Sequence, residues 1–582
     1  MAIIHLDNTQ LEPKAPSQPL NKHWMIALAF MFVVAMHFFI PNIGGSALML
    51  PFNATTWMAL SVAIALGMTQ LYRYQAIRYS KLTIALLLCC LLMTLPFFFP
   101  HSMSEYALPR LAGLWAGYLL FLLLQQFKLS NKHKLRLLWF IVIAATLEAL
   151  LGYAQYFYSL PIYVLGKSQN THIPYGIFQQ SDVMASFLAT GLILSAYLLS
   201  RQPVKYHRTL SATSLLYLLP TLTLPLIIAL SSAIGWVSTA ISTLLVLPYL
   251  YRYAIRQRFW GWLMSLGLGA LLGLSLNCPS LNESKSIHIQ DPALSIQQRS
   301  DIWLQSLDMV IEKPLTGYGY GRFESQYLLY TARQHQLNPN YPAGYPSLTH
   351  PSNELLLWTI EGGALPLIGL ILATCMVLFR IYTAKNGTRL AMLALFLPIA
   401  LNSLFNAVFS YSAIHWITFI ILLFWVDQRV ARYKTFSFSH NIRKALKFIN
   451  IILLVSTWLY MISALYSNAV LTQYYLTSKP RSIFSPHTTL AFGVWRDRFD
   501  QERYHRLLQF GLNQQRPDLL KSYIQWAQHD IQHSPQPQRY QALMLAYQAL
   551  GDEIRMKQVQ NEAYYLYPNL SFTMKASSSA AH

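Results

Sequence analysis

The sequence predicts an all-α polytopic membrane protein with one long loop and a helical tail outside the membrane. Of its 582 residues, 54% are hydrophobic and only 11% are charged, whereas soluble domains carry about 25% charged residues. Mean hydropathy is +0.33, and apolar runs long enough to cross a bilayer recur along the chain. These properties exclude a soluble enzyme, a DNA-binding factor or a disordered scaffold as a description of the whole chain.

Thirteen apolar runs of roughly 15–25 residues are candidate spans. No small-residue cleavage site follows the first run, so we interpret it as an uncleaved span and not as a signal peptide. The thirteen runs lie at residues 24–40, 54–71, 82–99, 109–127, 137–158, 181–199, 209–230, 233–250, 260–276, 354–378, 390–409, 412–426 and 448–466.

The basic residues predict the orientation of these spans. The net charge is +21, and more than half of the 43 lysines and arginines lie in alternate loops. Short loops on the other side hold only Arg110 and Lys167. Because cytoplasmic loops are enriched in basic residues, we expect a cytoplasmic N-terminus and, after thirteen spans, a periplasmic C-terminus.

Two long segments that are not apolar divide the chain. We expect function to concentrate in them, because long insertions are usually functional or disordered. The predicted divisions are a cytoplasmic N-terminus (1–23), nine spans (24–276), a periplasmic catalytic loop (277–353), four spans (354–466) and a periplasmic helical domain (467–582).

Within the long loop, Asp291-Pro292 is a favourable helix start, and the helix should end before Pro314. Its apolar stripe is typical of an amphipathic helix lying on the membrane surface. Arg299 precedes Trp303 by one turn; it can bind a phosphate through its guanidinium fork or can be a solvated surface arginine. Gly317, Gly319 and Gly321 lack the dinucleotide-binding spacing and predict a turn. The stripe consists of Ile296, Trp303, Leu307, Val310 and Ile311.

A histidine stands directly before the tenth span, in His350-Pro351-Ser352-Asn353-Glu354. Ser352 or Asn353 can cap the helix, whose N-terminus attracts anions. His350 is therefore a candidate general base, with a purely structural role as the alternative.

Three carboxylates lie in or beside apolar runs, where acids are costly and usually functional. Asp182 follows Gln179-Gln180 at the start of the sixth span, on the same side as His350. Glu361 lies in the tenth run, and Glu148 lies deeper, where it can simply bond to a neighbouring helix.

The tail shows helical periodicity over residues 502–567, in four short stretches with stops at Gly551 and Pro568. Paired short helices resemble a tetratricopeptide-like unit with an incomplete repeat signature. This domain can be a partner-binding surface or a plain helical cap. Residues 576–582 are small and polar, and we expect them to be disordered.

Several motifs, in this order, resemble one family over nearly the whole chain. They resemble those of the PglL-type and PglS-type bacterial O-oligosaccharyltransferases, which glycosylate pilins and belong with the O-antigen ligases and Wzy polymerases. The motifs are Pro41–Gly45, Tyr175–Asp182, the Arg299/Trp303 helix with Pro314–Gly319, and His350–Glu354.

This resemblance implies a GT-C-like enzyme that moves a preassembled glycan from undecaprenyl diphosphate to a serine or threonine of a periplasmic protein, often a pilin. It implies inverting, metal-independent chemistry without a cofactor. The implied partners are the lipid-linked oligosaccharide, a pilin-like acceptor and membrane lipid, with no nucleic acid. The implied location is the bacterial inner membrane.

The resemblance also implies roles for single residues. His350 matches the histidine proposed to activate the acceptor hydroxyl, Arg299 matches the arginine thought to hold the diphosphate, and Gln180 matches a glutamine of the sixth-span motif. Asp182 replaces an asparagine.

The chain also departs from the family pattern. Ala233 stands where the family often has a second arginine, for which Arg322 is a candidate substitute. A Glu-Tyr-Pro signature is replaced by Asn406–Phe409, and Tyr411 is the nearest tyrosine. These departures suggest a divergent, PglS-like branch.

Two other functions remain open. An O-antigen ligase or polymerase would transfer the same glycan to another glycan, and the tail favours a protein acceptor instead. A transporter of lipid-linked glycan belongs to a different class. It is disfavoured because the sequence shows no inverted repeat and no row of charges through the spans.

Overall fold

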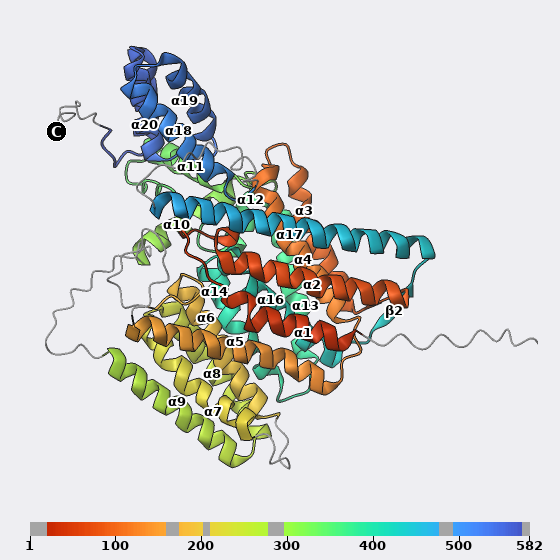
Figure 1. Cartoon of the computed structure of the whole chain (residues 1–582). Coiled ribbons are helices and arrows are strands. Elements are labelled where there is room, and N and C mark those ends of the chain that lie inside the picture. The colour runs from red at the N-terminus through yellow and green to blue at the C-terminus, as the bar shows by residue number, and fades with distance from the viewer. Residues whose placement is uncertain (1–19, 159–173, 202–209, 278–295, 477–492, 573–582) are drawn as a thin grey trace, which may run out of the picture.

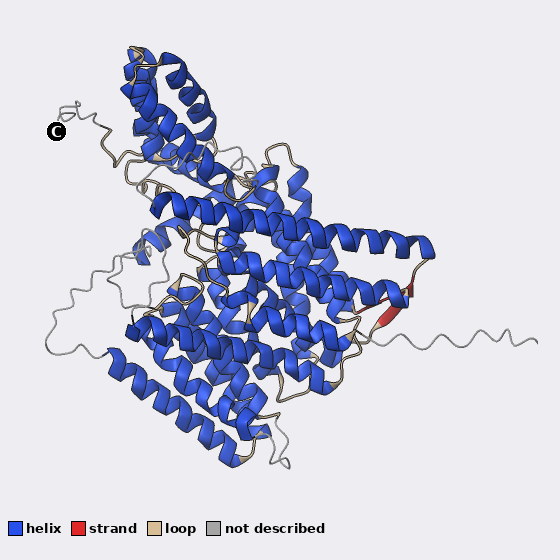
Figure 2. Cartoon of the chain, viewed as in Figure 1, coloured by secondary structure: helices blue, strands red, loops and turns tan. Residues whose placement is uncertain are grey.

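A computed structural model describes residues 20–158, 174–201, 210–277, 296–476 and 493–572. In this part of the chain almost every element is a helix, and two short strands form the one sheet (Figure 2). Strand β1 (Ala76–Tyr79) pairs antiparallel with β2 (Lys434–Ser437), with Ala76 opposite Ser437. The all-α polytopic prediction is therefore confirmed.

Each of the thirteen predicted spans overlaps a helix, although not all of the spans are continuous helices. Ten helical segments of the described residues are long and apolar enough to cross a membrane, with α3 counted together with the 3-10 turn that extends it to Phe98. The stretch Thr213–Ala229 of α7 and helix α14 are shorter apolar helices, and α1 has only 13 residues. The structure therefore supports a multi-pass membrane protein, while the number thirteen stays a prediction. The thirteen helices are α1 (Asn21–Val33), α2 (Pro51–Tyr74), α3 (Lys81–Thr94), α4 (Ser104–Leu124), α5 (Asn131–Tyr158), α6 (Ser181–Leu199), α7 (Leu210–Ala229), α8 (Ala233–Tyr253), α9 (Arg256–Asn277), α13 (Ala364–Tyr382), α14 (Arg389–Phe405), α16 (Ala413–Val430) and α17 (His440–Leu476).

The predicted span 354–378 is not one helix. It is broken at Gly363 into α12 (Glu354–Gly362) and α13. Gly363 has a φ of 69°, and a Cβ on it would lie 2.2 Å from the Leu315 carbonyl oxygen, so only glycine allows this close approach. The run 390–409 likewise ends early, at Phe405, and the short helix α15 (Val408–Tyr411) follows. The second interruption lies beside the candidate site.

Helix α6 lies at the centre of the bundle. Its residues from Val183 to Leu199 are all buried, and it packs against α5, α7, α8 and α14. A helix that is apolar on every face suits such a position. The start of α6 is therefore held rigidly.

The remaining helices gather at one end of the bundle, which we call the loop end, and β2 lies at the opposite end, the sheet end (Figure 1). The predicted loop helix is α10, which ends before Pro314 as expected; its predicted start at Asp291-Pro292 lies outside the described residues, as does 576–582. Gly317, Gly319 and Gly321 all have positive φ and form the predicted turn. The loop-end helices are α10 (Ile296–Glu312), α11 (Phe323–Leu337), α12, and four in the tail: α18 (Arg496–Asn513), α19 (Pro517–Asp530), α20 (Pro537–Ala549) and α21 (Glu553–Leu566).

The four predicted tail stretches are thus four helices, and they share a hydrophobic core with the loop. Tyr327 and Leu328 of α11 belong to the same buried cluster as Tyr540 and Leu543 of α20. The Ser534 hydroxyl also donates to a Glu324 carboxylate oxygen at 3.0 Å. The tail is therefore packed onto the loop and is not a separate appendage.

Candidate active site

A tight turn before α6 presents two of the predicted site residues. In α5, the Gln155 Oε1 accepts the backbone N–H groups of Tyr175 (3.0 Å) and Gly176 (2.8 Å). The Glu148 Oε1 accepts the Ile177 N–H at 2.9 Å. A Cβ at Gly176 would lie 1.8 Å from that carboxylate oxygen, so the turn requires glycine there. Glu148 thus has the structural role that the sequence left open: it fixes the turn that leads to Gln180.

Asp182 and Arg299 form a polar group that we call the arginine cluster, with Asn402 and Asn406. Arg299 Nη2 lies 3.6 Å from Asp182 Oδ2, and Arg299 Nη1 donates to Asn406 Oδ1 at 3.3 Å. Asn406 Nδ2 donates to Asp182 Oδ2 at 3.2 Å, and Asn402 Nδ2 donates to the Asp182 carbonyl at 2.9 Å. The Arg299 and Asp182 side chains are 26% and 25% exposed. The guanidinium is therefore oriented by amides and a carboxylate and still reachable from outside.

A second group, the histidine cluster, joins His350, Tyr411 and Gln180. The Ser352 N–H donates to His350 Nδ1 at 3.1 Å, so a neutral ring carries its proton on Nε2. That nitrogen lies 3.2 Å from the Tyr411 hydroxyl, which also bonds to the Gln180 side chain. Burial lowers the pKa of His350 to about 4. At neutral pH the ring is therefore uncharged and presents a donor.

The two clusters lie side by side because they share two chain segments. Gln180 and Asp182 are two residues apart at the start of α6, and Asn406 and Tyr411 flank α15. The Asn53 side chain of α2 holds the second segment: its Nδ2 donates to the Tyr411 carbonyl at 2.7 Å, and its Oδ1 accepts the Ala413 N–H at 2.9 Å.

Glu354 of α12 also braces the second segment. One carboxylate oxygen of Glu354 accepts the Ser410 backbone N–H at 2.9 Å and the Ser410 hydroxyl at 3.1 Å. The break after α14 is thus tied to the helix that directly follows His350.

This arrangement suits transfer from a phosphorylated donor to a hydroxyl. A guanidinium can stabilise the charge that develops on a leaving phosphate. A neutral imidazole and a phenol can orient an acceptor hydroxyl. Within the described residues, no group of three histidine, cysteine or acidic side chains is placed to hold a metal ion.

The structure brings five of the six predicted site residues together: His350, Arg299, Gln180, Asp182 and Tyr411 (all in the two clusters above). Arg322 is placed elsewhere, directly before α11, and its charge acts on His533 of the tail. Among the described residues, no hydrogen bond or ion pair links Arg322 to either cluster. Its predicted role as a second phosphate-binding arginine has no support from this geometry.

Sequence reasoning missed the amides that organise the site. Asn402 and Asn406 are four residues apart at the end of an apolar helix, where they share one face. That spacing could have indicated a polar contact, whereas Asn53 gave no comparable signal because its partners are far away in the chain.

Glu361, the third carboxylate near apolar runs, is structural. It pairs with Arg110 of α4 and accepts the N–H groups of Gly321 (3.0 Å) and Phe323 (3.2 Å). The Arg110 guanidinium lies 4.2 Å from the centre of the Trp358 ring. The hydrogen bonds of Glu361 thus fix the glycine turn against α12.

The fold and the site together define a polytopic membrane protein with a group of polar residues at its loop end, the candidate site. Three family models match the chain. The model described as O-Antigen ligase matches residues 216–374, and the one described as Virulence factor membrane-bound polymerase, C-terminal, matches 390–581. The model described as Protein glycosylation ligase matches 174–199, which includes Gln180 and Asp182. No curated protein matches the chain.

The three matches support the superfamily of O-antigen ligases and PglL protein glycosylation ligases for this chain. These families carry out glycan ligation by glycosyl transfer. The recognition made from the sequence motifs is thus confirmed.

Proposed function

We propose that this protein is an O-oligosaccharyltransferase of the bacterial inner membrane. It transfers a preassembled glycan en bloc from undecaprenyl diphosphate to a serine or threonine of a periplasmic protein, most simply a pilin or pilin-like protein. The N-terminus is cytoplasmic, and the loop end faces the periplasm. The observation that carries this proposal is the joining of the arginine and histidine clusters by two shared segments, one of which lies within the match to the protein glycosylation ligase model.

In the proposed reaction, Arg299 binds the diphosphate of the donor, which replaces Asp182 as the partner of the guanidinium. The acceptor hydroxyl oxygen attacks the anomeric carbon from the opposite side, and the bond from that carbon to the diphosphate oxygen breaks. The electron pair of that bond leaves with the lipid diphosphate, whose charge Arg299 stabilises. Inversion at the anomeric carbon follows from this single displacement.

His350 orients the acceptor hydroxyl in this proposal. Its Nε2–H points at the Tyr411 hydroxyl, where an incoming hydroxyl can join the same hydrogen-bond chain. A role as base at Nε2 would require the proton to move to Nδ1 and the Ser352 N–H contact to break. The hydroxyl proton therefore leaves late, to water, after the new C–O bond has begun to form. No metal ion takes part in these steps.

The experiment is transfer in cells. The chain is expressed with a lipid-linked glycan pathway and a candidate pilin, and the intact mass of the pilin is measured, with His350→Ala as the control. A gain of one glycan mass that the variant loses supports the proposal. Unmodified pilin in cells that form the donor and contain the wild-type protein would contradict it.

A glycan acceptor is the second candidate, because two of the three matching models describe an O-antigen ligase and a membrane-bound polymerase. Glycan-capped lipid A or lengthened glycan chains in the same cells, without pilin modification, would favour it.

A further inference from the structure

A cavity of about 440 Å³ lies at the sheet end, at the end of α16 opposite to the one that follows Tyr411. It is bounded by β1, by the connection between α4 and α5, and by the end of α16 with the residues that follow. Neither the proposed reaction nor the family matches assign it a role.

The charged residues that line this cavity are all cations. Arg78, Lys128 and Lys134 contribute to its wall, and no acidic residue is among the described residues that line it. The charges of Arg78 and Arg429 both act on Lys134. The Arg78 guanidinium lies 3.9 Å from the centre of the Tyr433 ring, which holds it in place at the wall. Like charges gathered in this way repel one another, and a bound anion would relieve that repulsion.

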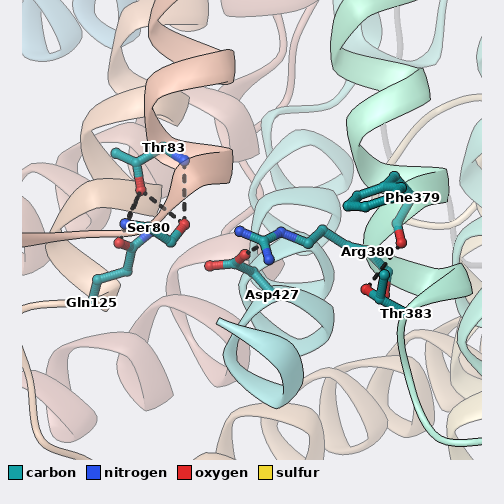
Figure 3. Close-up of polar contacts among 7 residues, drawn as sticks. All are labelled: Ser80, Thr83, Gln125, Phe379, Arg380, Thr383 and Asp427. Atoms are coloured by element: carbon teal, nitrogen blue, oxygen red, sulfur yellow. Dashed lines mark hydrogen bonds and ion pairs between the residues drawn. The ribbon is translucent and has the colours of Figure 1, made fainter. Parts of the chain in front are cut away.

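Asp427, the carboxylate next in sequence to the lining residue Gln428, is already paired with another cation. Asp427 of α16 is fully buried, and its Oδ1 lies 3.3 Å from Arg380 Nε of α13. Figure 3 shows these two side chains pointing toward one another. Asp427 is therefore not available as a counterion for the cations that line the cavity.

The cavity wall also holds a buried donor. Gln125 is 1% exposed, and its Oε1 accepts the Thr83 hydroxyl at 2.9 Å (Figure 3). Its Nε2 has no hydrogen-bond partner within the part of the chain that the structure describes. Buried donors are rarely left unpaired, so this group indicates a missing partner that accepts hydrogen bonds.

We propose that this cavity binds a phosphate-bearing anion, and specifically the headgroup of an anionic membrane phospholipid. Three cations and a buried amide donor match the oxygens of a phosphodiester. Phe127, Leu129 and Phe424 line the same cavity and provide apolar contact for the part of the acyl chains next to the headgroup. The leaflet is the cytoplasmic one in the orientation proposed above, but anion binding itself does not depend on the proposed reaction.

The test uses the purified, delipidated full-length protein. Native mass spectrometry measures retention of phosphatidylglycerol against phosphatidylethanolamine, and a thermal melt measures stabilisation by inorganic phosphate. The variant is Lys128→Gln with Lys134→Gln. The matched control is Lys132→Gln with Arg136→Gln, which removes the same charge from the same segment at exposed positions that do not line the cavity.

We expect preferential retention of phosphatidylglycerol by the wild-type and control proteins and a loss of roughly tenfold or more in the cavity variant. Stabilisation by phosphate alone, lost only in the cavity variant, would support the same anion chemistry with free phosphate as its source. Equal retention of the two lipids with no effect of phosphate, or an equal loss in the control, would overturn the proposal. Glycan transfer by the same proteins is measured separately, so failure of one proposal does not imply failure of the other.

Discussion

His350 is the residue on which the proposed chemistry depends most, because its hydrogen bonds decide what it can do. The Ser352 N–H occupies Nδ1, and the proton on Nε2 faces Tyr411. Ser352 reaches this geometry with a φ of 51°, an uncommon conformation for a residue other than glycine. Strain of this kind is found where a site must hold a side chain in one orientation.

Replacement of His350 distinguishes an orienting group from a base. A glutamine can donate through its amide from a similar position, but it cannot accept a proton. We expect His350→Gln to keep transfer within about tenfold of wild type and His350→Ala to lose about 100-fold, the difference of one good hydrogen bond. Single-turnover rates with purified donor check this. A glutamine variant as inactive as the alanine variant would show that His350 removes the proton.

The low pKa of His350 predicts the acid side of the pH profile. Burial lowers this pKa from 6.5 to about 4, so the folded protein keeps the ring neutral well below pH 6. We expect no loss of kcat/KM near pH 6.5 from this residue and a falling limb centred near pH 4. Profiles of the wild type and His350→Gln, which should lack that limb, provide the check.

Protonation of His350 also affects stability, with a definite sign. Between pH 6.5 and about 4 the unfolded state binds a proton that the folded state does not, so the contribution of His350 to stability falls as pH falls through this range. Above pH 6.5 that contribution is fully present. A wild-type activity limb centred near pH 6.5 and absent from His350→Gln would contradict the description of a buried neutral ring.

Arg299 should depend on its shape as well as on its charge. Its two terminal nitrogens contact different partners, Asn406 and Asp182, and lysine cannot reproduce that fork. We expect Arg299→Lys to retain partial transfer and Arg299→Ala to lose about 100-fold, as expected for a charge-assisted bond of about 1.5–3 kcal/mol. Donor-concentration series check this. Equal activity of the three proteins would remove Arg299 from the site.

At the scale of single residues, the sequence could name the candidate site residues, five of which the structure brings together, and not the groups that hold them. His350, Arg299 and Gln180 lie in recognisable motifs. Asn53 and Glu354 hold the 406–413 segment by hydrogen bonds. No local sequence pattern indicates that Asn53 bonds to Tyr411, which lies 358 residues away in the chain. The predicted phosphate role of Arg322 rested on loop membership alone, which does not fix where a side chain lies.

At the scale of elements, the 174–180 turn is the critical one, because α5 holds it and α6 starts from it. Gly176 permits Glu148 to approach the turn so closely that no side chain fits. The sequence predicted both α5 and α6 from their apolar runs. It did not predict that Glu148 and Gln155 pin the turn between them, since that requires the packing of the two helices.

A matched pair of glycine substitutions tests this element. Gly176→Ala places a methyl group on Glu148, and we expect it to destabilise the protein by more than 1 kcal/mol and to reduce transfer strongly. Gly267→Ala in α9 has nothing within 4 Å of the added carbon, and we expect no loss of either. Thermal melts and transfer assays measure both. Normal transfer by a stably folded Gly176→Ala protein would show that the turn does not position the site.

The helix breaks at Gly363 and after Phe405 were missed because both runs are apolar on average. Mean hydropathy alone does not distinguish one span from a short helix followed by another, whereas the Gly362-Gly363 pair and Asn406 are local signals that could have indicated the breaks. The break at Gly363 results from contact with Leu315, which lies on the loop. The break after Phe405 brings Asn406 and Tyr411 to the site.

At the scale of the whole molecule, the loop and the tail form one packed unit above the spans. Residues of α11 and α20 share a buried cluster, and the Ser534 hydroxyl of the tail donates to a Glu324 carboxylate oxygen of α11 at 3.0 Å. The sequence predicted four tail helices but could not predict that they complete the core of the loop. The resemblance to a tetratricopeptide unit and its role in acceptor choice stay predictions.

Removal of the tail should therefore affect the site through the loop. We expect the chain lacking residues 496–582 to insert in the membrane, because the spans form a core of their own. We expect it to lose most transfer, because removal of the tail would expose the buried residues Tyr327 and Leu328 of α11 to solvent. Membrane fractionation and pilin mass measure the two effects. Unchanged transfer by the truncated chain would reduce the tail to a cap.

In the proposed mechanism, the arginine cluster holds the donor and the histidine cluster orients the acceptor. A kinetic comparison of Arg299→Ala and His350→Ala in proteoliposomes with purified lipid-linked donor separates the two roles. We expect a KM for the donor raised at least tenfold in Arg299→Ala, and a lowered kcat with unchanged donor KM in His350→Ala. A raised donor KM in both variants, or in neither, would contradict this mechanism.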